Sequence, residues 1–273
     1  MFNLKKYIRK TLSALMPKGK LKEAFKLRYY NFIFRGKFQF KALSDGTYKT
    51  YINQISVTSK QALYHIAPDF LYYNTFYNIC PGDNVIDAGA NFGHLSTYYS
   101  KLTGTAGRVY AFEPDSINRM FITENIGLNT DCPKNIILED LLIWNTNSLI
   151  DFCESGTVGS SALYFNSTSK IIKKQSVTLD EWVFQQQIKR LNFIKMDIEG
   201  AEIQAMEGAV KVLTTLKPDL AIASYHIVDG KPTYIWLEKF FTEMNYPYKT
   251  VRFRHNEIIT FAGPSIVSNS HEI

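Results

Sequence analysis

The sequence predicts an α/β fold built on a mostly parallel sheet, and two observations lead to that prediction. The first is size, because a chain of 273 residues with 45% hydrophobic residues can bury one large core together with a small appendage. The second is a pattern: between Pro81 and Gly263, short apolar runs alternate with segments of helical period. Such alternation is typical of βαβ units, whose parallel strands carry helices on both faces of the sheet.

The predicted elements follow one another in that order. Most strands are short apolar runs, the last two are strand-like runs in the tail, and the helices are longer segments of helical period. Pro114 is placed to end the second strand. The polar stretch 155–170 is expected to be a loop. Strands are expected at 84–87, 109–113, 135–138, 193–197, 220–224, 248–253 and 257–261, and helices at 93–101, 116–128, 201–216 and 233–244.

The N-terminal region differs from the rest of the chain in its charge. Residues 1–41 carry twelve Lys or Arg and one acid, Glu23, for a net charge of +11, which leaves −5 for the remainder of a chain whose net charge is +6. A basic arm on an acidic body argues against a nucleic-acid partner and for a local electrostatic role at one end. The arm contains an apolar stripe at helical spacing, made of Leu4, Ile8, Leu12 and Leu15, opposite Lys6, Arg9 and Lys10.

Two interpretations of this arm stay open. A basic amphipathic helix can lie on an anionic membrane, or its apolar stripe can pack on the domain or on a second subunit. The alternating segment 32–40 predicts a hairpin or edge pair that helps to cover a cleft. We therefore expect a basic N-terminal extension over residues 1–79, partly packed on the core, and the main domain over residues 80–273.

The cysteines and apolar segments predict a cytoplasmic protein, at most peripheral at the inner membrane surface. Cys80, Cys132 and Cys153 are an odd number without a CxxC pair, so they indicate neither a disulfide framework nor a thiolate zinc site. No apolar run approaches the roughly 20 residues that a membrane-spanning helix needs. The N-terminus also lacks the pattern of a cleaved signal.

A glycine-containing turn follows the first predicted strand. The sequence VIDAGANFG at 85–93 puts Asp87 and two glycines at the carboxyl edge of the sheet, where open α/β sheets bind ligands. Gly89 allows a tight turn and the close approach of a ligand, and Gly93 allows close packing of helix on strand. A dinucleotide would be served by GxGxxG. The carboxylate of Asp87 instead suits a ligand with an ammonium and a sulfonium, as S-adenosylmethionine has.

An acid also ends the second predicted strand. Glu113 lies about 20 residues after the glycine turn, where a carboxylate can accept hydrogen bonds from both ribose hydroxyls. Each acid alone has a structural explanation, since Asp87 could cap a helix and Glu113 could lie in solvent. Together, and at this spacing, they predict a nucleoside-binding site.

Four motifs carry a family resemblance. VIDAGANFG, VYAFEPD at 109–115, VTLD at 177–180 and FIKMDIEGAE at 193–202 together resemble the FkbM-type methyltransferase family over about residues 80–262. The resemblance implies a Rossmann-like class I methyltransferase sandwich with a seven-stranded sheet and S-adenosylmethionine as donor. It also implies that Asp87, Gly89, Asn91, Phe92 and Gly93 hold the methionine part of the cofactor, that Glu113 binds its ribose, and that Asp197 and Glu199 line the active-site cleft.

Asp197 ends another predicted strand at the same edge of the sheet. It could contact the cofactor ammonium, orient the acceptor hydroxyl or ligate a metal. Alternatively, the negative charges of Asp197 and Glu199 only balance the positive N-terminal end of the dipole of the helix that follows. A divalent metal stays undecided, because both carboxylates offer hard oxygen ligands but the sequence fixes no third ligand.

His226 is the candidate base. Methyl transfer from a sulfonium is an in-line displacement that depends on alignment, and a hydroxyl acceptor also needs a group that takes its proton. His226 follows the run 220–225 and can take a proton near neutral pH, although such a histidine can also be structural. Family members commonly carry a glutamate two residues before this histidine. This chain has Ser224 there, which leaves the assignment of the base open.

The sequence thus predicts an S-adenosylmethionine-dependent methyltransferase with His226 and Asp197 as catalytic residues. The resemblance favours O-methylation of a sugar, glycolipid or secondary-metabolite hydroxyl. Two alternatives stay open, a nicotinamide-dependent oxidoreductase, whose GxGxxG is missing here, and a non-catalytic binding protein with a Rossmann fold. The sequence predicts no oligomeric state.

Overall fold

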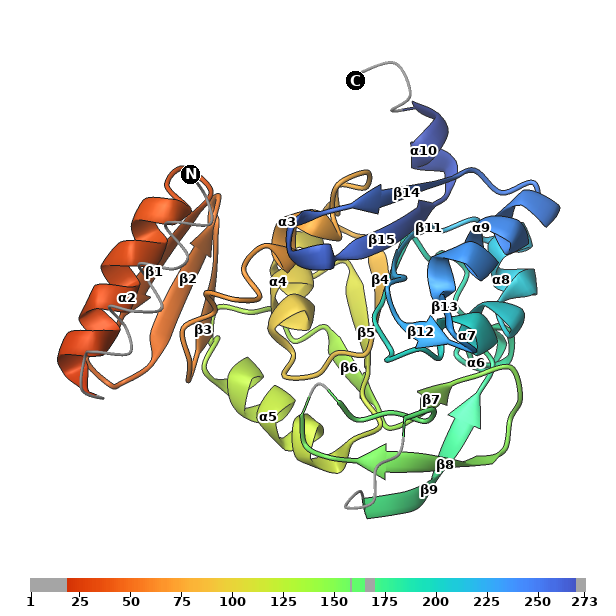
Figure 1. Cartoon of the computed structure of the whole chain (residues 1–273), viewed down its shortest axis with the longest axis horizontal. Coiled ribbons are helices and arrows are strands. Elements are labelled where there is room, and N and C mark those ends of the chain that lie inside the picture. Colours follow the sequence, from red (N-terminus) through yellow and green to blue (C-terminus); the bar gives the residue numbers. More distant parts are fainter. Residues whose placement is uncertain (1–18, 158, 165–169, 269–273) are drawn as a thin grey trace. The chain divides into compact units, whose positions relative to one another are not determined.

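The computed structural model describes residues 19–268 apart from 158 and 165–169, and Figure 1 shows the arrangement of its elements. By its internal contacts the chain divides into two compact units, residues 1–67 and 68–273. The expected boundary after residue 79 stays a prediction. The amphipathic stripe from Leu4 to Leu15 lies outside the described residues.

The first unit is a helix with a small antiparallel sheet. The hairpin expected at 32–40 is wrong, because this segment holds the end of a helix, a turn and the start of a strand that lies at the edge of the small sheet. Tyr30 and Phe34 stack one helical turn apart, with ring centroids 6.2 Å from each other. The Asn31 side chain then fixes the strand by hydrogen bonds to the N–H and C=O of Phe40, at 2.7 and 2.9 Å. The unit comprises α2 (Lys20–Ile33), β1 (Phe38–Ala42), β2 (Tyr48–Ile52) and β3 (Ile55–Ser59), with one hairpin between β1 and β2 and a second between β2 and β3.

The second unit is built on the seven-stranded, mostly parallel sheet that was predicted. Its strand order is β14-β15-β11-β10-β4-β5-β6, and among these strands only β15 runs against its neighbours. Every residue of β10 and β11 is buried, in agreement with continuous apolar runs covered on both faces. The strands are β4 (Asn84–Ala88), β5 (Arg108–Phe112), β6 (Ile136–Glu139), β10 (Phe193–Met196), β11 (Asp219–Ala223), β14 (Tyr248–Arg252) and β15 (Ile258–Ala262).

Helices cover both faces of this sheet (Figure 1). One face packs through a large apolar cluster on α6 to α9, and Ala111 on the other face packs against α5. The single helix expected at 201–216 is two helices, because Asp180 accepts hydrogen bonds from the backbone N–H groups of Lys211 and Val212 and so starts a new helix. The helices are α3 (Asp69–Tyr72), α4 (His94–Thr103), α5 (Ser116–Gly127), α6 (Leu179–Gln185), α7 (Glu202–Glu207), α8 (Val210–Thr215), α9 (Thr233–Glu243) and α10 (Pro264–Ser268), with the short 3-10 helix η1 (Arg254–Asn256).

Two small sheets in the second unit were not predicted. One has the order β7-β9-β8 and the other pairs β12 with β13. The described part of 155–169 forms no helix and no continuous strand. None of the described helices has the length and apolarity that crossing a bilayer requires. The additional strands are β7 (Leu142–Ile143), β8 (Leu149–Glu154), β9 (Lys170–Val177), β12 (Ile227–Val228) and β13 (Lys231–Pro232).

Candidate active site

The turn after β4 is packed tightly against the loop after β10. Gly89 has φ of 74°, a left-handed conformation that favours glycine. A Cβ there would lie 1.9 Å from the backbone oxygen of Asp197, so the close approach at Gly89 is made by the chain's own backbone. At Gly93, with φ of 73°, a Cβ would lie 2.9 Å from Ile122 of α5. Gly93 therefore allows packing of α4 against α5, where packing of helix on strand was expected.

Asp87 is enclosed by the protein. Its side chain is fully buried, and its Oδ2 accepts a hydrogen bond from Ser96 at 2.5 Å. Its Oδ1 lies 3.2 Å from Nζ of Lys195, which also donates to the carbonyls of Ala88 and Gly89. Asp87 thus neutralises Lys195 and fixes the start of the turn. A contact from its carboxylate to a cofactor ammonium stays a prediction.

Glu113 joins the glycine turn to the start of α5. Its Oε2 accepts the backbone N–H of Asn91 at 2.7 Å, and its Oε1 accepts that of Asp115 at 3.0 Å. Asn91 has φ of 52°, a left-handed backbone conformation at this hydrogen bond. Burial raises the pKa of Glu113 to about 7, although the hydrogen bonds from Asp115 and Asn91 act in the opposite direction. The carboxylate therefore lies beside the glycine turn, as a ribose ligand would.

An aromatic group lies beside the same turn. The half-buried ring of Phe92 is edge-on to those of His94 and Phe121, with centroids 6.3 and 5.1 Å away. Burial lowers the pKa of His94 to about 4, so its imidazole is neutral at physiological pH. His94 was not singled out in the sequence, because a single histidine at a helix start carries no distinct pattern.

Asp197 follows β10 at the carboxyl edge of the sheet. Its backbone N–H donates to the carbonyl of Ala88 at 3.1 Å, which ties the loop after β10 to β4. Tyr73, which directly follows α3, donates its hydroxyl to Oδ2 of Asp197 at 3.0 Å. The other oxygen, Oδ1, has no hydrogen-bond partner among the described residues. Sequence reasoning missed Tyr73, because 124 residues separate it from Asp197.

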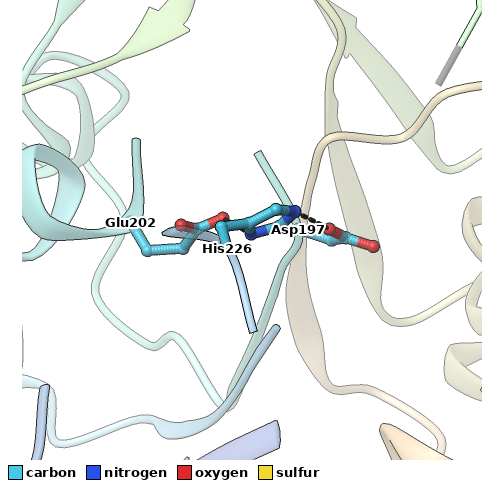
Figure 2. Close-up of side chains that lie close together, drawn as sticks. All are labelled: Asp197, Glu202 and His226. Atoms are coloured by element: carbon cyan, nitrogen blue, oxygen red, sulfur yellow. Dashed lines mark ion pairs between the residues drawn. The ribbon is translucent and has the colours of Figure 1, made fainter. Parts of the chain in front are cut away.

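His226 lies between carboxylates that come from the loop after β10 and from α7. Figure 2 shows the imidazole between Glu202 on one side and Asp197 on the other. Nδ1 lies 3.1 Å from Oε1 of Glu202, and Nε2 lies 3.7 Å from both Oδ1 of Asp197 and Oε2 of Glu199. Burial lowers the pKa of His226, but Glu202, Asp197 and Glu199 outweigh this effect and raise it to about 9. The structure thus brings both predicted catalytic residues together.

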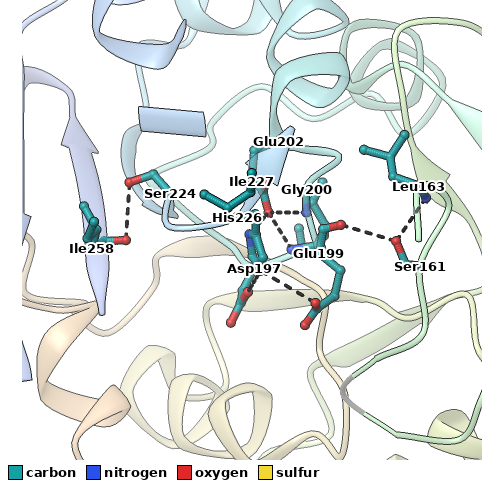
Figure 3. A network of polar contacts seen from close by, with 12 residues as sticks. Ser161, Leu163, Asp197, Glu199, Gly200, Glu202, Ser224, His226, Ile227 and Ile258 are labelled. Atoms are coloured by element: carbon teal, nitrogen blue, oxygen red, sulfur yellow. Dashed lines mark hydrogen bonds and ion pairs between the residues drawn. The ribbon is translucent and has the colours of Figure 1, made fainter. Parts of the chain in front are cut away.

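Polar contacts connect this cluster to the neighbouring elements, as Figure 3 shows. Ser224 stands where the family commonly has glutamate. Its hydroxyl donates to the carbonyl of Ile258 and accepts from Thr260, so it is engaged with β15. On the other side, the Ser161 hydroxyl donates to the backbone carbonyl of Glu199 at 3.3 Å.

The cluster has an excess of negative charge. Burial, followed by the charge of Asp197, raises the pKa of Asp69 to about 8 and that of Glu199 to about 7. The same two causes raise the pKa of Glu257. Because Lys195 is paired with Asp87, its charge is already balanced. A cationic ligand would therefore be favoured at this edge of the sheet.

The same residues bear on a metal site. Asp197, Glu202 and His226 each offer one ligand atom, and these atoms lie within 4.8 Å of one another. The two ring nitrogens of His226 face opposite carboxylates, however, and one nitrogen at a time can bind a given ion. The described geometry is that of a histidine held between two acids, and a divalent metal stays undecided.

Sequence comparison places this fold and site in a family. Residues 87–261, more than half of the chain, match the model of the methyltransferase FkbM domain. The chain belongs to the FkbM methyltransferase family. The matched residues begin at Asp87 and include Glu113, Asp197 and His226.

Individual relatives are distant. The hexuronic acid methyltransferase AglP of Haloferax volcanii is 24% identical over 135 residues, which are 49% of this chain and 53% of the relative. The crystal structure of methyltransferase FkbM from Methylobacillus flagellatus KT is 20% identical, with a TM-score of 0.53 over 70% of this chain and 47% of that one. The chain therefore spans about half the length of these two relatives. The structural likeness shows the class I methyltransferase fold that was predicted.

Proposed function

We propose that the protein transfers the methyl group of S-adenosylmethionine to a hydroxyl of a sugar, glycolipid or secondary metabolite. One observation carries the proposal: the glycine turn, Glu113, Asp197 and His226 all lie at the carboxyl edge of one sheet. Membership of the FkbM family and a distant relative that is a hexuronic acid methyltransferase support it. The acceptor of this chain is the subject of the labelling experiment below.

The donor side of the site is proposed around the glycine turn. Asp87, Gly89, Asn91, Phe92 and Gly93 form the turn against which the methionine part would lie, and Glu113 would accept the ribose hydroxyls. The acidic surroundings suit a donor that carries a sulfonium and an ammonium, because opposite charges attract strongly where water is excluded.

The acceptor side is proposed around Asp197 and His226. Asp197 would orient the acceptor hydroxyl through Oδ1, which has no hydrogen-bond partner among the described residues, and Nε2 of His226 would take the proton. A cationic donor bound nearby lowers the pKa of His226, since like charges disfavour the imidazolium. The histidine is then neutral when the acceptor reacts.

A labelling experiment tests the reaction. Fractionated cell extract is incubated with the protein and methyl-labelled S-adenosylmethionine, and labelled products are resolved by mass spectrometry. We expect label in an ether-linked methyl group with the wild type and with Glu243→Gln, an exposed control, and at most a tenth as much with Asp197→Asn. Equal labelling by Asp197→Asn, or label only on nitrogen or carbon, contradicts the proposal.

A thermal shift experiment separates the two alternatives. A ligand that binds only the folded state raises its melting temperature. S-adenosylhomocysteine should raise it and NAD should not. The reverse result indicates an oxidoreductase, and no shift with either ligand indicates a non-catalytic binding protein.

A further inference from the structure

Glu202 is a buried acid that makes none of the contacts proposed for the donor or the acceptor. It is the first residue of α7, and its side chain is fully buried. Its Oε1 accepts the backbone N–H groups of Ile198 at 3.1 Å and Gly200 at 3.3 Å. These bonds fix the carboxylate within the loop that carries Asp197.

The same Oε1 lies 3.1 Å from Nδ1 of His226. His226 is 7% exposed, so its ring has little freedom to turn away. Because Nδ1 faces Glu202, Nε2 faces the opposite way, toward Asp197 and Glu199, which are both partly exposed (Figures 2 and 3). Nε2 is buried and has no hydrogen-bond partner among the described residues. Because Nδ1 faces Glu202, Nε2 is the ring nitrogen left to receive a proton.

We propose that Glu202 is the positioning residue for His226: it holds the proton on Nδ1 and directs the basic Nε2 at the acceptor hydroxyl. The inference rests on the proposed methyl transfer and assigns a role to a residue outside the cofactor and acceptor contacts. A buried carboxylate that fixes the tautomer of a catalytic histidine acts in this way in hydrolase triads. The proposed donor contacts include neither Glu202 nor this pairing.

The proton and electron balance of the step is complete. The acceptor oxygen forms a bond to the methyl carbon while the carbon–sulfur bond breaks, and its electron pair stays on sulfur to give S-adenosylhomocysteine. The O–H proton moves to Nε2, and the negative charge of Glu202 stabilises the resulting imidazolium. The proton then passes to solvent, so no further reactant is required.

The groups around the imidazole support this role for Glu202 specifically. Asp197, Glu199 and Glu257 also act on His226, but the first two lie 3.7 Å from Nε2 and none of the three is fully buried. Lys195 is paired with Asp87 and does not compete for Glu202. A metal ligand role for His226 is the alternative, and it is an outcome of the test.

The test is nuclear magnetic resonance of the His226 ring nitrogens in the full chain, with S-adenosylhomocysteine bound. We expect the neutral ring of the wild type to carry its proton on Nδ1. In Glu202→Gln, which keeps the oxygen that accepts the two backbone bonds, we expect the pKa of His226 to fall by at least about one unit. Glu243→Gln, an exposed glutamate, should leave the signals unchanged.

Activity gives a second measurement once an acceptor is found. Glu202→Gln should lower kcat by about tenfold or more while the affinity for S-adenosylhomocysteine stays within twofold of wild type. Glu202→Asp, which keeps the charge, should have a kcat between those of Glu202→Gln and the wild type. It replaces Glu202→Gln in the test if the glutamine variant does not fold.

Two results overturn the inference. One is a His226 pKa and tautomer that are the same in Glu202→Gln and Glu243→Gln. The other is saturable Mn²⁺ binding that broadens the Nε2 signal and is lost in His226→Gln, since Nε2 would then be a metal ligand. Failure of the proposed function looks different, because the wild type would then not bind S-adenosylhomocysteine.

Discussion

Replacing Gly89 with alanine tests the packing on which the whole site depends. The residue has φ of 74°, and an added Cβ would lie 1.9 Å from the backbone oxygen of Asp197. Gly230→Ala is the matched control, because its φ is 75° and nothing lies within 4 Å of the added Cβ. The positive φ costs alanine about 1–2 kcal/mol at both sites. Only Gly89 adds the clash, which costs about 1–3 kcal/mol more.

Urea unfolding and calorimetry measure the two consequences. We expect Gly89→Ala to lower the free energy of unfolding by about 1–3 kcal/mol more than Gly230→Ala does. Because the clash moves the turn after β4 away from Asp197, it should also weaken S-adenosylhomocysteine binding at least about tenfold. The control should bind within twofold of wild type. Equal stability and equal affinity of the two variants would refute the reasoning.

Three further predictions follow from the charges. Burial raises the pKa of Glu113 from 4.5 to about 7, so folding favours its protonated form, and stability is lost as the pH rises through 7. Between pH 4.5 and about 7, the free energy of unfolding of the wild type should fall by up to about 3 kcal/mol relative to that of Glu113→Gln. If urea unfolding gives the two proteins the same dependence of stability on pH, the prediction is contradicted. Lys195→Met leaves the charge of the buried Asp87 unpaired and should lower the free energy of unfolding by about 3–5 kcal/mol. Adding Asp87→Asn should recover most of that stability; a double variant as unstable as Lys195→Met would show that the two residues do not act as a pair. If the arm 1–41 lies on membranes, full-length protein should co-sediment with anionic but not neutral vesicles, less so at high salt, and absence of binding to either would discard that interpretation.

The central sheet could be predicted because its signals are local. Most of its strands are short, largely apolar runs, and the glycine turn and Glu113 follow two of them directly. The parallel arrangement then brings the ends of separate strands to one edge, so residues as distant as Asp87 and Asp197 could be placed together from the sequence.

Contacts between distant or mixed segments could not be predicted. The alternation at 32–40 has a strand-like period, but Tyr30 and Phe34 stack as neighbours on a helix. The strand begins only at residue 38, where the Asn31 side chain forms hydrogen bonds with the backbone of Phe40. The local sequence pattern does not reveal this contact. In the same way, the role of Glu202 depends on which ring nitrogen of His226 it meets. Spacing along the chain carries no information on that.

The most direct test of the central claim is calorimetry of the folded protein with S-adenosylmethionine, S-adenosylhomocysteine and NAD. The structure predicts saturable binding of the first two at one site per chain, weakened by Glu113→Ala, and no binding of NAD. Folded wild-type protein that gives no heat with S-adenosylmethionine or S-adenosylhomocysteine would contradict the claim that this edge of the sheet binds a methyl donor.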